Sequence, residues 1–181
     1  MSQPNNKLRE IFAPAIQQKC WHVSVGGCTL PTFSLAIGAK IKRDKPLKNQ
    51  AQPEVFRNYR PEISFLIWCA WRLHHGDSVL VTHKGDEDEI VGNLRLLVGN
   101  SLTEIGVAPP AWDLMLNFTE GFKLAIFCDH AGKKPVFDGN WQARVKGVEV
   151  NAGPGSHLNT INELDTPTIA DPKPLGSDLD L

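Results

Sequence analysis

Apolar and polar residues alternate in several short stretches of the chain. The sequences FSLAI at 33–37 and FKLAI at 122–126 place a large apolar residue at every second position. The stretch WDLMLNF at 112–118 alternates in the same way, and it follows a proline pair that favours an extended backbone. Because side chains point to opposite faces of a strand in turn, this pattern predicts half-buried β-strands.

Two further stretches have the form of β-hairpins. Trp71-Arg72-Leu73 is followed by Gly76 and then by apolar residues up to Val81. Residues 141–145 are followed in the same manner by Gly147 and a second apolar run, 148–150. A strand, a glycine turn and another strand are predicted at both places.

Helical spacing is found at two places. Apolar residues recur at intervals of three and four in the segments 8–12 and 90–97, which predicts a short helix in each. An acidic, glycine-containing segment, HKGDEDE at 83–89, precedes the second helix, and Asp86 or Asp88 is a suitable N-cap. We interpret residues 83–93 as a connector that also contains the start of this helix.

The order of these elements indicates an internal repeat. A helix followed by an antiparallel meander occurs in residues 1–82 and again in residues 94–155, although gaps of unequal length are needed to align the two. We therefore expect an α+β fold of mainly antiparallel sheet. Its two similar halves are expected to pack with approximate two-fold symmetry, because the apolar face of each small sheet must be covered.

Two segments fall outside the repeat. Residues 40–61 are rich in lysine, proline and amide side chains, and this insertion in the first half is expected to be a long surface loop. Residues 156–181 contain prolines, few apolar residues and five acidic side chains against one lysine. This composition predicts a flexible acidic tail.

Composition narrows the class of protein. The 181 residues are 41% hydrophobic and 22% charged, with a net charge of -1, which is typical of a soluble globular protein. No apolar run is long enough for a membrane helix, so we expect a cytoplasmic protein with no membrane partner. The four cysteines are widely spaced, which favours reduced thiols over a disulfide framework.

The sequence Cys128-Asp129-His130 ends the predicted strand at 122–126 and has two interpretations. A Cys-x-His pair could supply two zinc ligands, or Cys128 could act as a nucleophile beside an imidazole. However, no second compact ligand pair accompanies it. We favour the interpretation that Cys128 closes a buried strand while Asp129 and His130 form turn hydrogen bonds, and we expect no metal and no cofactor.

Tryptophans and aspartates give further candidate binding residues. Trp68 and Trp71 are three residues apart, so one of the two is expected to be exposed on a regular strand, where an indole can anchor an interface. Four polar residues could face a common polar pocket, although a solvated sheet face explains them equally well: Asp113, Asp129, Asp138 and Asn140.

The basic part of the insertion suggests a different partner. Lys42 and Arg43 belong to a cluster at 40–48 with a single acidic residue, which could contact phosphates. No aromatic residues are interleaved with it, and no recognised nucleic-acid motif, phosphate loop, dinucleotide fingerprint or metalloprotease motif is found. We therefore favour a solvated loop over a nucleic-acid site.

The segments LRLLVGN, WDLMLNFTEGFKLAIF and NWQARV resemble those of small two-repeat β-rich proteins from bacteria, some of which are encoded beside toxin–immunity systems. The resemblance covers residues 8–155, whereas the insertion and the tail depart from it. It implies a compact binding fold and no catalytic residues. We expect a non-enzymatic bacterial factor that binds another protein, of immunity or accessory type. The alternatives are an enzyme that uses Cys128, Asp129 and His130, and a nucleic-acid-associated protein that uses the loop at 40–48.

Overall fold

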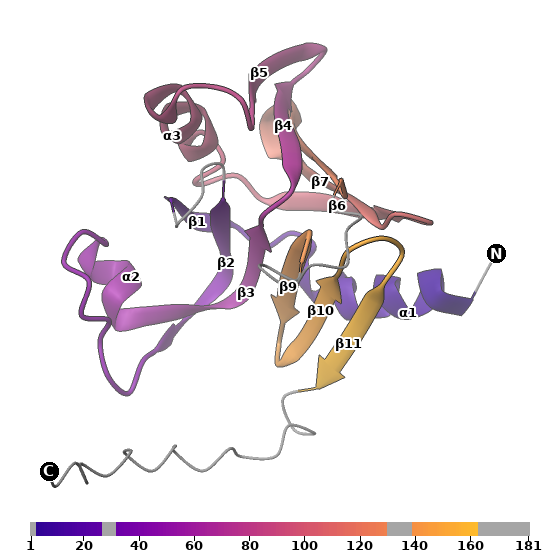
Figure 1. The fold of residues 1–181 in the computed structure, drawn as a ribbon. Helices are drawn as coiled ribbons and strands as arrows, with labels where there is room; N and C mark the ends of the chain where they lie inside the picture. The colour runs from indigo at the N-terminus through magenta and orange to yellow at the C-terminus, as the bar shows by residue number, and fades with distance from the viewer. Residues whose placement is uncertain (1–2, 27–31, 130–138, 163–181) are drawn as a thin grey trace, which may run out of the picture.

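The computed structural model describes residues 3–26, 32–129 and 139–162. Within them, the chain forms two antiparallel β-sheets and three short α-helices, α1 (Gln3–Phe12), α2 (Glu54–Asn58) and α3 (Glu87–Arg95) (Figure 1). The fold is thus α+β and mainly antiparallel β, as the sequence predicts.

The first sheet has six strands in the order β1-β2-β3-β9-β10-β11. Each strand pairs with its neighbours in antiparallel register. Their bounds are β1 Cys20–Val25, β2 Phe33–Lys42, β3 Tyr59–Ile67, β9 Trp141–Val145, β10 Val148–Ala152 and β11 Leu158–Asn162.

The second sheet has five strands in the order β5-β4-β8-β7-β6 and is also antiparallel. Their bounds are β4 Ala70–His75, β5 Ser78–Thr82, β6 Leu102–Ala108, β7 Asp113–Phe118 and β8 Phe122–Phe127. Short 3-10 turns, η1 (Ala13–Ala15) and η2 (Thr119–Gly121), lie after α1 and between β7 and β8. The predicted strands and both predicted hairpins are therefore confirmed.

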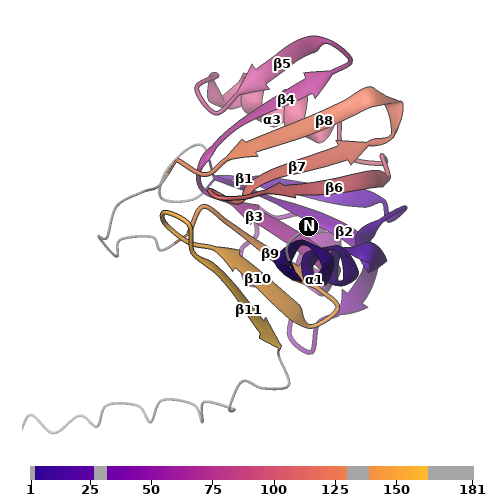
Figure 2. The ribbon, with the colours of Figure 1, turned by 90° about the vertical axis from the view of Figure 1, so that its right-hand side faces the viewer.

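The two sheets face each other across one apolar core. Figure 2 shows them one above the other, with α1 seen nearly end-on at the side of the pair that faces the viewer. Phe33 on β2 meets Trp71 on β4 edge to face, with ring centroids 5.0 Å apart, and Phe12 of α1 stacks on Phe65 of β3. Ile90, Leu94 and Leu97, at and just after α3, are also fully buried. This core is where the periodic apolar residues are located.

The halves of the chain do not form separate sheets. The first half provides β1, β2 and β3 to the six-stranded sheet and β4 and β5 to the five-stranded one, whereas the second half provides β6, β7 and β8 to the latter and β9 and β10 to the former. The similar sequences at 33–37 and 122–126 lie at different places in this order. β2 lies between two strands of its own half, whereas β8 pairs with β4 from the other half.

Two expected boundaries differ from the observed ones. Residues 40–61 are not one loop, because β2 extends to Lys42, α2 covers 54–58, and β3 starts at Tyr59. The long strands form because the register of β2 with β3 continues to the pair Lys42–Tyr59, beyond a bulge between Ile37 and Lys40.

The second difference lies at the expected tail. Residues 158–162 form β11, which pairs along its whole length with β10, so the ordered fold extends past Gly155. The sequence pattern did not predict β11, because its residues are mostly polar and only Leu158 is as much as half-buried. Residues 163–181 lie outside the described residues.

Candidate functional site

The outer face of the six-stranded sheet has small and polar side chains. Its register aligns one row across all six strands, and that row contains hydroxyl and amide groups except at one leucine. In order across the sheet, the row is Ser24, Ser34, Leu66, Gln142, Asn151 and Asn159. Since the opposite face forms the core, this polar face is the one directed away from the core.

A β-bulge in β1 changes which side chains reach this face. The register with β2 shifts between Cys20 and His22, so Trp21 is the additional residue. Both Trp21 and His22 then contact the same ring, Phe56 of α2, with centroids 6.1 Å and 4.4 Å away. Alternation alone would have placed these two neighbours on opposite faces.

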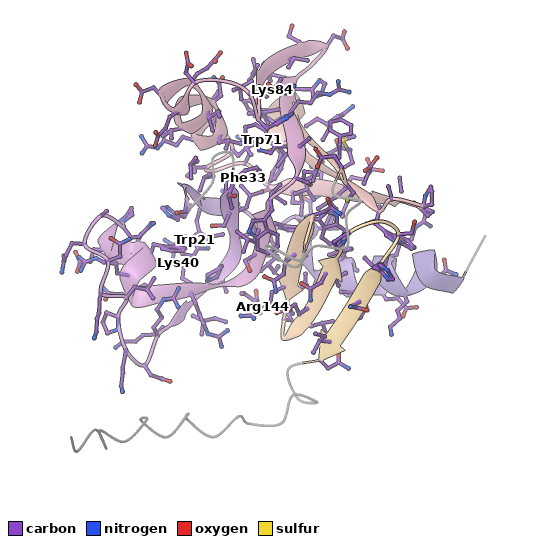
Figure 3. The ribbon with its side chains drawn as sticks, in the orientation of Figure 1. Trp21, Phe33, Lys40, Trp71, Lys84 and Arg144 are labelled. Carbon is purple, nitrogen blue, oxygen red and sulfur yellow. The ribbon has the colours of Figure 1, made fainter. Side chains whose placement is uncertain are left out.

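The segment 43–58, which contains α2, lies over β1 and β2. Gln52 donates a hydrogen bond to the Ser24 hydroxyl at 3.0 Å. Lys40 lies 5.2 Å from the centre of the Trp21 ring, and the Arg43 guanidinium lies 5.8 Å from that of Phe56. Figure 3 shows Trp21 and Lys40 close together beside α2, with Arg144 on β9. The basic residues thus have aromatic contacts, supplied by other parts of the chain.

Three guanidinium groups surround a hollow beside this segment. Arg43, Arg60 and Arg144 line a cleft of about 300 Å³, which we call the arginine cleft. Its floor is formed by small side chains, Ser34 and Ser64 among them. None of the described residues that line it is acidic.

Charge in the arginine cleft is only partly balanced. Arg144 forms an ion pair with Glu149 at 3.0 Å. Arg43 donates from Nε to the Tyr59 carbonyl at 3.2 Å, which fixes its head group without neutralising it. Burial and the neighbouring charge of Arg60 lower the pKa of Arg43. Like charges held together in this way favour an anion between them.

A second hollow, of about 530 Å³, lies between β1, residues 51–53 and α3, and is lined by His22, Gln52 and Arg95 among others. Burial lowers the pKa of His22, a hydrogen bond with Gln52 opposes the shift, and the positive charge of Arg95 adds to it. His22 is therefore neutral at pH 7.

Unpaired polar atoms are concentrated at this segment. Of the four buried side-chain atoms without a hydrogen-bond partner among the described residues, three are Trp21 Nε1, His22 Nε2 and Arg57 Nε. Buried polar atoms are normally paired, and exceptions call for a physical reason. Their position under or within 43–58 indicates a cover that is held less firmly than the core.

A second cluster lies where the chain passes from one sheet to the other. Trp68 and Cys69 connect β3 to β4, and their amides both donate to the Asn140 carbonyl. The fully buried Asn140 also donates from Nδ2 to the Gly153 carbonyl at 2.8 Å. The Trp141 indole donates to the Trp112 carbonyl at 2.8 Å. We call this region the sheet junction.

The predicted residues Asp113, Cys128 and Asp129 belong to the sheet junction. Asp113 Oδ1 accepts from the Cys128 amide at 2.7 Å, and Asp129 Oδ1 accepts from the Ala70 amide at 3.3 Å. Both carboxylates hold ends of strands by accepting backbone hydrogen bonds, which is the structural role expected of polar residues at a turn.

The other predicted site residues are dispersed. Trp71 is 1% exposed and is therefore not the exposed member of the pair Trp68 and Trp71, because its strand belongs to the second sheet and its ring faces the core. Trp68 is half-buried. Lys42 is exposed at the end of β2, and Arg43 lines the arginine cleft.

Two predicted residues, His130 and Asp138, lie outside the described residues. The catalytic alternative for Cys128, Asp129 and His130 is therefore untested. Within the ranges that the structure describes, no three His, Cys, Asp or Glu side chains are grouped so as to hold a metal ion. No helix in these ranges is long and apolar enough to cross a membrane.

Sequence reasoning missed the residues that complete both clusters. Cys69 is not among the site residues that the sequence predicts, yet it lies opposite Cys128, one position beyond the pair Ala70–Phe127. Arg60 and Arg144 are 84 positions apart in sequence and meet only because β3 pairs with β9. The sequence contained a pattern that predicts individual strands, but nothing in it specifies that β3 pairs with β9.

Comparisons of the chain with protein-family models, with curated proteins and with solved structures gave no match.

Proposed function

We propose that this protein is a non-enzymatic binding factor that recognises an acidic segment of a partner protein on the outer face of its six-stranded sheet. The observation that supports this most is the arginine cleft, in which three guanidinium groups line one hollow without a lining carboxylate among the described residues. Guanidinium groups pair with carboxylates through two parallel hydrogen bonds, which makes them suitable for reading acidic side chains.

The surroundings of the cleft favour a peptide over a nucleic acid. The row that contains Ser34 and Gln142 offers hydroxyl and amide groups, which can pair with the backbone of an extended segment. Residues 1–162 have eighteen Lys and Arg against fifteen Asp and Glu, a net charge of only +3. A nucleic-acid surface needs a larger basic stripe than this. An immunity-type or accessory role would be one instance of such binding.

The segment 43–58 supports the same assignment. It provides Arg43 and Phe56 to the lining of the cleft, and none of the residues of its helix α2 is fully buried. It also covers Trp21 Nε1 and His22 Nε2, which have no hydrogen-bond partner among the described residues. A bound acidic segment that displaces part of this cover would give those atoms partners.

We also infer that the two halves of the chain are related by an approximate two-fold axis. The strand order supports this. In the six-stranded sheet β1-β2-β3 is followed by β9-β10, and in the five-stranded sheet β6-β7-β8 is followed by β4-β5, so each half contributes three strands to one sheet and two to the other in the same order. Under this relation, the segment 43–58 corresponds only to η2 between β7 and β8, so the proposed binding site is specific to one half. Superposition of α1 to β5 on α3 to β10 is the test.

Fluorescence anisotropy with a labelled hexaglutamate peptide tests the function. We expect it to bind at least tenfold more tightly than a hexaglutamine peptide at low salt and to weaken as salt is raised. The variant Arg43→Ala/Arg60→Ala/Arg144→Ala should lose at least tenfold in affinity for hexaglutamate, since each lost charged pair is worth about 1 kcal/mol or more.

The matched control removes the same charge elsewhere. Lys7, Lys84 and Lys123 are exposed and outside the cleft, so their triple alanine variant should change the affinity less than threefold. Equal losses of hexaglutamate affinity in the two variants would show that binding depends only on overall charge, and this would contradict the proposal. So would a labelled single-stranded oligonucleotide that binds the cleft more tightly than hexaglutamate does.

A further inference from the structure

Cys69 and Cys128 face each other at the sheet junction. The ladder between β4 and β8 ends at the pair Ala70–Phe127, and the two cysteines occupy the next position on each chain. Residues opposite each other in antiparallel strands have Cα atoms about 4.5–5.5 Å apart. This spacing lies within the range that a disulfide can span, about 4.4–6.8 Å.

The two thiols lie close enough to interact, because a hydrogen bond with Cys128 raises the pKa of the Cys69 thiol. Cys128 Sγ also donates to the Trp112 carbonyl at 3.3 Å. Trp112, whose carbonyl accepts from both Cys128 Sγ and the Trp141 indole, has a left-handed backbone with φ of 69°. A bulky residue rarely takes this conformation, so the local structure holds the carbonyl in place.

We propose that Cys69 and Cys128 are a modification site, at which a peroxide oxidises the dithiol to an intrachain disulfide and a small thiol reverses the reaction. This inference is independent of the proposed binding function, because the pair does not line the arginine cleft. Both cysteines are free in the structure, which corresponds to the reduced state.

The difference in exposure assigns the order of the steps. Cys128 is half-buried and Cys69 is 2% exposed, so Cys128 meets the oxidant first. The Cys128 thiol loses its proton, and the thiolate attacks one oxygen of hydrogen peroxide and becomes a sulfenic acid. The other oxygen leaves as hydroxide, which takes up the released proton to form water. The Cys69 sulfur then attacks Cys128 Sγ, the S–S bond forms, and the sulfenic oxygen leaves as a second water. The two sulfurs lose two electrons in total, and the peroxide gains them.

The surroundings keep the reduced pair stable at rest. The hydrogen bond with Cys128, burial and the nearby charge of Asp129 all raise the pKa of the Cys69 thiol. Since only the thiolate is nucleophilic, we expect the attack of Cys69 on the sulfenic acid of Cys128 to be slow at neutral pH and to become faster as the pH rises. Oxidation removes one hydrogen bond to the Trp112 carbonyl but leaves the bond from the Trp141 indole.

Alkylation and mass spectrometry test the site. The variant Cys20→Ser/Cys28→Ser retains only the proposed pair. After hydrogen peroxide, catalase and denaturation, it should take up no N-ethylmaleimide, against two equivalents before oxidation and two again after dithiothreitol. Trypsin should yield the peptides 58–72 and 124–133 joined by a disulfide, and mapping of the unsubstituted chain should give the same link without any change to its sequence.

A variant with two differently placed thiols is the matched control. Cys28→Ser/Cys69→Ser retains Cys128 and Cys20, whose thiol contacts the His22 carbonyl instead. It should form the intrachain disulfide at least tenfold more slowly. Equal rates in the two variants, retention of both thiols in the folded protein after peroxide, or links only between molecules would overturn the proposal.

Discussion

His22 shows how the surroundings of one side chain set its charge at the residue scale. The β1 bulge places it against Phe56 and beside Arg95, so burial and a positive neighbour both disfavour the imidazolium. In the unfolded chain the same imidazole has its ordinary pKa. The unfolded state therefore binds a proton at a higher pH than the folded state does, and protonation of His22 favours unfolding.

This gives a pH prediction for stability. Because the folded pKa of His22 is lowered below 6.5, its contribution to the free energy of unfolding is fully present above pH 6.5 and is lost as the pH falls from there through the folded pKa. Urea unfolding between pH 7.5 and pH 5 should show a declining midpoint, and His22→Gln should make the decline shallower. His74, whose pKa is also lowered, continues to contribute in this variant. The same slope in His22→Gln and in the unsubstituted protein would contradict the assignment.

At the scale of elements, the β2–β3 hairpin is independent of the segment that joins its strands. The register continues to Lys42–Tyr59, and the Arg43 amide donates to the Asn58 carbonyl at 2.9 Å, so a tight turn could close the hairpin there. No residue of α2 is fully buried. Folding of the sheet and the proposed recognition of a partner are thus separable.

We predict that replacing residues 44–57 with Asn-Gly preserves the fold and weakens hexaglutamate binding, because the cleft loses Phe56 and with it the ring against which the Arg43 guanidinium packs. Asn-Gly favours the turn type that matches the twist of a two-residue hairpin. The cost in free energy of unfolding should be smaller than the ~2–5 kcal/mol of a core truncation such as Leu73→Ala, which serves as the comparison. Chemical unfolding and anisotropy measure the two effects. A replacement variant that binds hexaglutamate with unchanged affinity would show that the segment is not needed for the site.

At the scale of the whole molecule, both halves of the chain are required for each sheet. β3 pairs with β9, β4 pairs with β8, and the chain crosses between the sheets at Cys69 and again before Trp141. The sheet junction, which fastens this crossing, therefore stabilises both sheets together. β11 completes the six-stranded sheet and covers the edge of β10.

Truncation distinguishes β11 from the segment that follows it. A chain that ends after Asn162 retains every described strand and should unfold at an unchanged temperature. A chain that ends after Gly155 loses β11, the partly buried Leu158 and the Ser156 carbonyl that accepts from the Trp112 indole at 2.8 Å. Its thermal unfolding midpoint should fall by roughly 5 °C. The lost burial is worth ~1–3 kcal/mol, and each kcal/mol shifts the midpoint of a chain of this size by ~2–4 °C. An exposed β10 edge should also promote association. Calorimetry and light scattering are the measurements.

The sequence alone determined which local structure each segment adopts. Alternation in FSLAI and WDLMLNF specified β2 and β7, glycine turns specified two hairpins, and helical spacing specified α1 and α3, because these signals depend only on neighbouring residues. The sequence did not predict the polar strand β11, because its hydrogen bonds to β10, and not its side chains, place it in the sheet.

The tertiary structure decided which strands become neighbours, and with them both candidate sites. Arg144 reaches Arg60 only through the pairing of β3 with β9, and Cys69 reaches Cys128 only through that of β4 with β8. Pairing between distant strands follows from burial of the shared core, a property of the whole chain that no short segment encodes. For the same reason, Trp71 became a core residue, while the small polar residues of the outer face formed the floor of a cleft.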